Sequence, residues 1–244
     1  MSFTLSEIAA DAGRLWRRER ALLLPVAGLF YFLPALALLL LLPQPEAPAD
    51  PASDAAGEAL IAYATDNAGA ILGANLANIV GAMLLLLLFL GRPRPTMAEA
   101  FRRGATLFPA FLLVVLAMWA MLFVGAFLIL PAFYLIGRFF LVTSVAAAEG
   151  PQGPVRAMAR SFELTRGRGW LLFVLAAAVF VAGQLLVTIA GTADRALIAG
   201  GMGSPPTFIL FNALAAFASA GASVLTLLMK VAVYRRVTGS SNGM

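Results

Sequence analysis

The sequence lacks histidine and cysteine altogether, and it has few charged residues for its length. Of its 244 residues, 12% are charged and 61% are apolar. The absence of cysteine excludes disulfides and thiolate chemistry, and the absence of histidine removes the commonest general base and the commonest metal ligand. We therefore expect no catalytic residues, no metal site and no cofactor. The composition also lies far from that of a soluble domain.

A long apolar run is the most informative feature that the chain does contain. Between residues 107 and 148 the only Asp, Glu, Lys or Arg is Arg138. This run is about twice as long as one helix needs to cross a hydrocarbon core of roughly 30 Å, so it predicts two spanning helices that fold back on each other. The chain is therefore predicted to be an all-α, polytopic integral membrane protein.

Six apolar stretches are long enough to span a bilayer with some tilt. They cover residues 21–42, 68–90, 109–130, 131–148, 169–189 and 208–233, and none of them contains Asp or Glu. Six spans form three hairpins and place both termini on one side of the membrane. We expect a single membrane domain over residues 1–244. Its predicted parts are an interfacial helix (1–20), a hairpin with a long outer loop at 43–67 (21–90), an interfacial helix plus hairpin (91–148), and a third such unit with a short tail (149–244).

The charged residues assign the sides of the membrane. Apart from Arg138 and Arg195, every Lys and Arg lies in the N-terminal arm, after the second span, after the fourth span or at the end of the last. The positive-inside rule makes these four segments, and with them both termini, cytoplasmic. The loop at 43–67 carries only acidic charges, which agrees with an outer location, and residues 57–65 are predicted to form a short helix. Because the basic residues sort by side, the net charge of +5 does not indicate a nucleic-acid partner.

The start of the chain has a competing interpretation as a secretory signal. Arg20 precedes a Leu-rich run that ends near Ala47-Pro48-Ala49, which resembles a cleavage site. The apolar run is longer than a typical signal core and follows a polar helix of 20 residues. The sequence therefore favours a first membrane span.

A basic amphipathic segment precedes each pair of spans, which predicts three interfacial helices. The first two begin with capping boxes, Thr4 with Glu7 and Thr96 with Glu99, and the third begins at Pro154, a favourable first-turn residue. Two interpretations stay open for these segments. They are either ordinary connectors that place Arg among headgroups, or a collar that binds anionic lipid or a partner protein.

Arg138 is the first candidate functional residue, because a charge within a span is costly and usually has a purpose. No carboxylate is available inside the spans, so its partner is expected to be an amide, a carbonyl, water, a lipid phosphate or a bound anion. The candidate contacts are Tyr134 on the same helix and Asn75, Asn78, Gln184 and Asn212 on other spans. Headgroup anchoring, internal bonding and ligand contact all stay open as its role.

The second span carries a stripe of small residues four apart. Gly69, Gly73, Ala77 and Gly81 form the small-xxx-small pattern that lets two helices approach closely. We expect the stripe to serve helix packing, against a small face on the last span that includes Ala215.

A degenerate motif begins within the fourth span and continues after it. Its residues are Tyr134-x-x-x-Arg138, Glu149-Gly150 and Ala157-x-x-x-Ser161-x-x-Leu164-Thr165-x-Gly167. This pattern, with the six-span layout, resembles the YciC-like bacterial inner-membrane proteins and the related membrane domain of some glycerophosphodiester phosphodiesterases. The resemblance implies a six-helix module of the bacterial cytoplasmic (inner) membrane without assigned chemistry.

The resemblance also implies a role for the motif residues. Arg138, Glu149, Ser161 and Thr165 are expected to form a structural junction at the cytoplasmic face, to which Arg160 also belongs. Glu149 would either accept bonds from the following helix or pair with a neighbouring arginine. The chain lacks the acidic and histidine residues of the phosphodiesterase domain, so hydrolase activity does not carry over.

Three functional hypotheses follow from the sequence. The leading one is a non-enzymatic integral membrane protein with a structural, scaffold or lipid-associated role. Its partners would be the bilayer, with anionic lipids at the cytoplasmic face, and a membrane-protein partner or a second copy of the chain. The alternative is a transporter or channel for a small anion or lipid, with Arg138 as its fixed positive site. An intramembrane enzyme is disfavoured, because nothing pairs a nucleophile with a base.

Overall fold

The structure is a computed structural model that describes residues 4–42, 54–126, 129–150 and 153–239, and these ranges contain helices and no strand. The helices are α1 (Leu5–Ala27), the π-helical turn η1 (Gly28–Phe32), α2 (Leu33–Leu41), α3 (Asp54–Asp66), α4 (Ala68–Leu90), α5 (Met97–Ala126), α6 (Ile129–Arg138), α7 (Val142–Glu149), α8 (Pro154–Leu164), α9 (Gly169–Ala199) and α10 (Pro205–Val237). Six segments in the described ranges are long and apolar enough to cross a membrane. The all-α membrane fold is therefore confirmed.

The N-terminal helix does not break where the sequence predicts the end of the interfacial segment. Helical structure continues from Leu5 through η1 to Leu41. Thr4 and Glu7 form the predicted capping box at its start. Pro25 and Pro34 lie on either side of the π turn, and neither has the N–H that continues the α-helical ladder. The predicted interfacial segment and the first span thus form one continuous helical segment.

The second predicted interfacial segment is also continuous with its span. Thr96 and Glu99 bond to each other at the start of α5, which then runs unbroken past Pro109 to Ala126. Only the third segment is a separate helix. It is α8, which Thr165–Arg168 separates from α9, with Gly167 in a left-handed turn at φ 75°.

The fourth predicted span is two helices rather than one. Helix α6 ends at Arg138, and α7 begins at Val142 after a tight turn. In a continuous helix the Arg138 carbonyl would accept from the Val142 N–H, which here bonds to the Phe139 carbonyl at 3.1 Å instead. The freed carbonyl accepts hydrogen bonds from α8, which explains why the helix stops in an apolar stretch without proline.

Several described helices extend beyond the bounds that the sequence predicts, among them α10, which runs from Pro205 to Val237 rather than over 208–233. α3 begins at Asp54 rather than at residue 57, and α9 continues past residue 189 to Ala199. The extra turns of α9 contain Asp194, which is 8% exposed. The predicted spans end short of this residue, which is why they contain no carboxylate.

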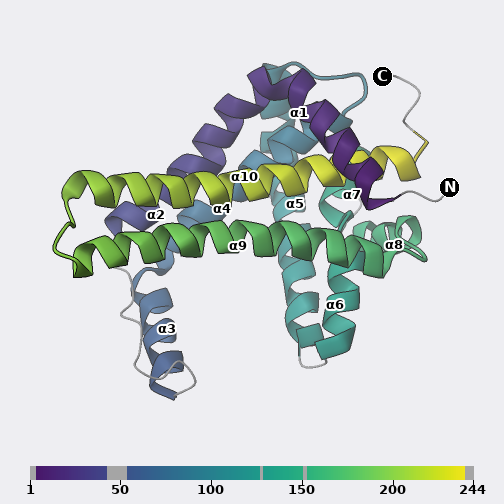
Figure 1. Ribbon diagram of the computed structural model, residues 1–244. Coiled ribbons are helices and arrows are strands. Elements are labelled where there is room, and N and C mark those ends of the chain that lie inside the picture. The colour runs from purple at the N-terminus through teal and green to yellow at the C-terminus, as the bar shows by residue number, and fades with distance from the viewer. Residues whose placement is uncertain (1–3, 43–53, 127–128, 151–152, 240–244) are drawn as a thin grey trace.

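The long hairpin of α9 and α10 dominates the arrangement in Figure 1. The two helices run antiparallel side by side, α1 packs across α10, and α5 and α6 extend from this pair in another direction. Helix α3 stands apart from the other helices and contacts α4. Arg236 near the end of α10 forms ion pairs with Glu7 and Asp11 of α1, so the first and last described helices are joined.

The core lies around the C-terminal half of α4. Every residue from 83 to 90 is buried, which is expected of a helix segment that is apolar on all sides. Helices α5, α7 and α10 contact α4. Their ends meet where α4 ends, and a polar cavity lies there.

Candidate functional site

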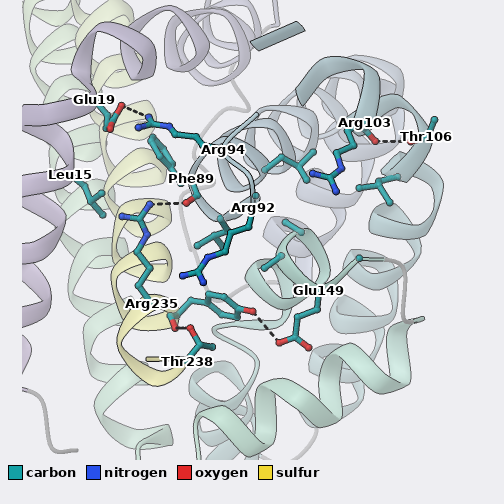
Figure 2. Close-up of a pocket in the computed structure, with 18 of the residues that line it drawn as sticks. Leu15, Glu19, Phe89, Arg92, Arg94, Arg103, Thr106, Glu149, Arg235 and Thr238 are labelled. Carbon is teal, nitrogen blue, oxygen red and sulfur yellow. Dashed lines mark hydrogen bonds and ion pairs between the residues drawn. The ribbon is translucent and has the colours of Figure 1, made fainter. Parts of the chain in front are cut away.

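A cavity of about 790 Å³ lies where α4, α7 and α10 end, with walls from α1 and α5 (Figure 2). We call it the arginine pocket. Its lining residues are Leu15, Arg18, Glu19, Leu87, Phe89, Leu90, Gly91, Arg92, Arg94, Arg103, Thr106, Leu107, Ala147, Ala148, Glu149, Gly150, Tyr234, Arg235 and Thr238. Five of them are arginines and two are glutamates, so the lining has a formal excess of three positive charges.

Local sequence signals place the charged side chains around this cavity. Helix α4 ends at Gly91, and the turn to α5 contains Pro93 and Pro95, which cannot continue a helical ladder. The turn therefore brings Arg92 and Arg94 beside the cavity. Arg103 comes from the second turn of α5, and the C-terminal turn of α10 adds Arg235.

Three of the pocket arginines are already engaged. Arg94 forms an ion pair with Glu19 at 2.6 Å, and Arg18 lies 3.5 Å from the other oxygen of the same carboxylate. Arg235 donates to the backbone carbonyl of Phe89 at 2.7 Å, so it caps the end of α4. These bonds hold α1 and α10 against the end of α4.

The other two arginines, Arg92 and Arg103, are unengaged. Neither side chain makes a hydrogen bond or an ion pair to another described residue. Both are exposed at the cavity, and Figure 2 shows them as separate side chains from two different segments. Glu99, one turn before Arg103, has its hydrogen bonds with Thr96, and it attracts Arg103 electrostatically without forming an ion pair. The pocket therefore presents two guanidinium groups whose donors are free for a ligand.

Glu149 connects the pocket to the segment that follows it. Its carboxylate accepts from the Tyr234 hydroxyl at 3.0 Å and from Arg160 Nε at 3.4 Å. Arg160 also donates to Glu163 at 3.0 Å, and these two carboxylates raise the pKa of Arg160 above its ordinary value, Glu163 with the larger effect. The structure thus brings together Glu149 and Arg160, which the sequence places in one junction.

The junction around Arg138 lies beside the pocket and is closed. The Arg138 carbonyl accepts from Ser161 Oγ at 2.7 Å and from Thr165 Oγ1 at 3.3 Å, and both hydroxyl residues are fully buried. The guanidinium carbon lies 4.6 Å from the ring centre of Phe162 and 5.7 Å from that of Tyr134. Arg138 is 8% exposed, and its Nε and Nη1 have no hydrogen-bond partner in the described part of the chain. Aromatic faces therefore hold this cation where no carboxylate does.

None of the four amides expected near Arg138 bonds to it in the described residues. Asn75 donates to the carbonyl of Ile71, and Asn212 donates to that of Phe208, each within its own helix. Asn78 has a buried Oδ1 without a partner. Gln184 is exposed on α9. Tyr134 is the one predicted contact that faces Arg138, and Phe162 is a contact that the sequence did not indicate.

A second cation lies within the predicted last span. Lys230 Nζ donates to Thr143 Oγ1 at 3.4 Å and lies 5.7 Å from the ring centre of Phe140. Like Arg138, it lies beside an aromatic ring, and in addition its side chain donates to a hydroxyl. Phe140 lies in the turn between α6 and α7, and Thr143 lies in the first turn of α7. Hydrophobic periodicity does not predict the break between these two helices.

The small-residue stripe of α4 has different surroundings along its length. A Cβ added at Gly81 would lie 2.6 Å from Phe30 Cβ and 3.1 Å from Tyr31 Cε2, so this end packs closely against η1. A Cβ added at Gly69 or Gly73 would have no atom within 4 Å, and Ala77 is half-buried. Only the Gly81 end of the stripe makes a close approach.

The described ranges contain no group of three or more His, Cys, Asp or Glu residues placed to hold a metal ion. Comparisons with protein-family models, with curated proteins and with solved structures found no match. The six apolar helices identify an integral membrane protein. The arginine pocket and the Arg138 junction are therefore the features that bear on its role.

Proposed function

We propose that this protein is a non-enzymatic integral membrane protein of the bacterial cytoplasmic membrane that binds anionic lipid headgroups in the arginine pocket at its cytoplasmic face. The observation that carries the proposal is the pair of unengaged guanidinium groups, Arg92 and Arg103, in a cavity with an excess of positive charge. Guanidinium is the group best suited to recognise phosphate, because its planar fork donates two parallel hydrogen bonds.

The location of the pocket supports a membrane ligand. It lies at the ends of apolar helices, where the proposed topology places the cytoplasmic headgroup layer. Near an anionic leaflet each Lys or Arg contributes about 1 kcal/mol of attraction. The remaining arginines of the four basic segments add to this attraction without having to enter the pocket.

A catalytic role receives no support from the side chains that line the pocket. Thr106 and Thr238 donate their hydroxyl hydrogens to the carbonyls of Arg103 and Tyr234 in their own helices. Each of these bonds goes to a backbone carbonyl rather than to the general base that a nucleophile requires for activation. We therefore assign binding rather than hydrolysis to this site.

The geometry of Arg138 favours a structural role over transport. Two aromatic rings cover its guanidinium, and its carbonyl fixes α8 through Ser161 and Thr165. A fixed site for a passing anion needs an accessible cation, and this one is 92% enclosed by its own protein. The YciC-like relationship is part of our proposal and is based on the motif residues alone.

The test compares lipids on the purified protein. We expect an anionic phospholipid to raise the melting temperature in detergent more than phosphatidylcholine does, and added salt to weaken the effect. In the double variant Arg92→Gln/Arg103→Gln, the anionic lipid and phosphatidylcholine should raise the melting temperature equally. In Arg102→Gln, the anionic lipid should still raise it more. Arg102 is the matched control, because it is exposed beside Arg103 on α5 but does not line the pocket. Equal stabilisation by neutral and anionic lipids would contradict the proposal.

A further inference from the structure

A second cavity, of about 630 Å³, lies between α1, η1 and α10 and shares no lining residue with the arginine pocket. We call it the apolar groove. All of its lining residues are Ala, Gly, Val, Leu, Phe or Trp, and the indole N–H of Trp16 is the one side-chain hydrogen-bonding group among them. The walls of the groove are therefore suited to a hydrocarbon ligand.

Three glycines of the apolar groove are not explained by the packing of the fold. Gly13, Gly28 and Gly221 lie within helices, where glycine is less favourable than alanine. None of them has a positive φ, and a Cβ added at any of them would have no atom within 4 Å. Neither the backbone conformation nor a close helix contact requires glycine at these positions. Their shared effect is to keep the groove open.

The length of the groove along α1 and η1 matches one leaflet of a bilayer. Its deeper part is lined by Gly28 and Phe32 of the π-helical turn, a rare element that occurs frequently at functional sites. Phe32 follows Arg20, the residue before the first predicted span, by about 18 Å along the helix at 1.5 Å per residue. One leaflet of a hydrocarbon core of roughly 30 Å is about 15 Å thick. The groove can therefore accommodate an acyl chain along its length.

A cation lies on the groove face of α1. Arg20 is one turn after Trp16 and one turn before Leu24, and both of these residues line the groove. Arg20 is exposed and makes no hydrogen bond or ion pair with another described residue. The three carboxylates of α1 are all in ion pairs with other arginines. The guanidinium group of Arg20 is therefore available to an anion at the edge of the groove.

We propose that the apolar groove binds one acyl chain of an anionic phospholipid, and that Arg20 binds the phosphate of the same lipid. Trp16, one turn from Arg20, is a residue type typical of the membrane interface. An apolar helix of a second copy would also cover the walls, but it would leave the charge of Arg20 without a counterpart. This inference rests on the proposed anionic-lipid function for its headgroup, and it adds a second lipid site away from the arginine pocket.

The experiment uses tryptophan fluorescence in vesicles of phosphatidylcholine, because bromine on an acyl chain quenches a tryptophan that it contacts. Trp119→Phe/Trp170→Phe leaves Trp16 as the reporter of the groove. Trp16→Phe/Trp170→Phe leaves Trp119, which is exposed on α5 outside the groove and reports the surrounding lipid. Brominated phosphatidylglycerol should half-quench Trp16 at about a fivefold lower mole fraction than brominated phosphatidylcholine, as expected for one arginine at an anionic headgroup. The two lipids should quench Trp119 equally.

Two substitutions in the Trp16 reporter separate the headgroup contact from the groove. Arg20→Gln should remove the preference for phosphatidylglycerol and keep quenching by both lipids, whereas Arg102→Gln on α5 should keep the preference. Gly221→Leu fills the groove and should reduce quenching by both lipids. Gly73→Leu is its control, because the space beside Gly73 is equally open but lies on α4 outside the groove.

The outcomes distinguish this inference from the proposed function. Equal quenching of Trp16 by the two lipids would overturn the inference, and this comparison needs neither the Arg20 nor the Gly221 variant to fold. Weak quenching of Trp16 by both lipids, with strong quenching of Trp119, would show that protein fills the groove and would overturn it as well. Arg92→Gln/Arg103→Gln should keep the preference at Trp16, so the groove and the arginine pocket can fail separately.

Discussion

The arginine pocket and the Arg138 junction use the same residue type in opposite environments. In the pocket, Arg92 and Arg103 are exposed and have no partner among the described residues. In the junction, Arg138 is enclosed by Phe162 and Tyr134, and its carbonyl, not its side chain, makes the hydrogen bonds. The comparison separates an arginine that rings enclose, which packs against its own protein, from two exposed arginines, to which we assign ligand binding only as a proposal.

The two regions are also mechanically connected. Glu149 lines the pocket and bonds to Tyr234 of α10, while Arg160 of α8 reaches it from the junction side. The turn after Arg138 determines where α7 starts and therefore where Glu149 lies. A change in the junction should reach the pocket, whereas a change at Arg92 or Arg103 should remain local.

The largest expected effect comes from Gly137 on the junction side. A Cβ at this position would overlap the carbonyl of Gly169 and lie 3.0 Å from the backbone nitrogen of Phe173. Gly137→Ala should cost at least about 3 kcal/mol of unfolding free energy, because backbone rather than a flexible side chain must move. Denaturant unfolding in detergent measures this. Gly73→Ala is the control, since nothing lies within 4 Å there, and a similar loss in both variants would contradict the close packing.

Removing the hydroxyls that hold the Arg138 carbonyl should have the next largest effect. Ser161→Ala with Thr165→Val leaves a buried carbonyl without a partner, which costs about 2 kcal/mol. Ser161→Ala alone should cost about half as much, because Thr165 Oγ1 still donates. Thr192→Val, on an exposed hydroxyl bonded within α9, provides the baseline. Thermal unfolding of the four proteins would show whether the carbonyl needs either donor.

The charge of Arg138 itself should matter less than its packing. Arg138→Met keeps a long flexible side chain between the rings and removes two donors that have no partner, so stability should change by about 1 kcal/mol or less. Arg138→Ala should lose more, because it also removes the aliphatic stem. If Met proves as damaging as Ala, the cation has a partner or a function that the junction does not provide.

The smallest expected effect is on the stability of the ligand-free pocket variants. Arg92→Gln and Arg103→Gln remove exposed charges that make no hydrogen bond or ion pair with the described residues, so the unfolding free energy should stay within about 0.5 kcal/mol. Arg235→Gln should differ from both, since it releases the Phe89 carbonyl at the end of α4. Loss of stability at Arg92 equal to that at Arg235 would remove the distinction between engaged and unengaged arginines.

The membrane class and much of the fold could be predicted because apolar length is a local property. Helix α4 has the bounds that the sequence predicts, and the capping pair of Thr4 and Glu7 forms as expected. The break after Arg138 could not be predicted, because it depends on the hydroxyls of Ser161 in α8 and Thr165 just after it, which are 23 and 27 residues away. No glycine or proline marks the turn itself.

The arginine pocket could not be predicted from the sequence either. Its charged residues come from α1, α5, α7, α10 and the turn after α4, and each segment alone resembles an ordinary basic connector. Which arginines stay unengaged depends on tertiary contacts such as Arg235 with Phe89. By contrast, Tyr134 and Arg138 are one turn apart on α6, and their proximity follows from helical spacing.

The ion pairs between α1 and α10 set an order of events during synthesis. Arg236 reaches Asp11 across 225 residues, and α10 also supplies Tyr234 and Arg235 to the pocket. At ribosomal rates of about 5 to 20 residues per second, α1 waits roughly 10 to 45 s for this partner. Until then Asp11 has only Arg14 of its own helix as an ion-pair partner, and the pocket lacks the residues that α10 supplies. A nascent chain arrested before α10 would therefore be inserted in the bilayer with an incomplete arginine pocket.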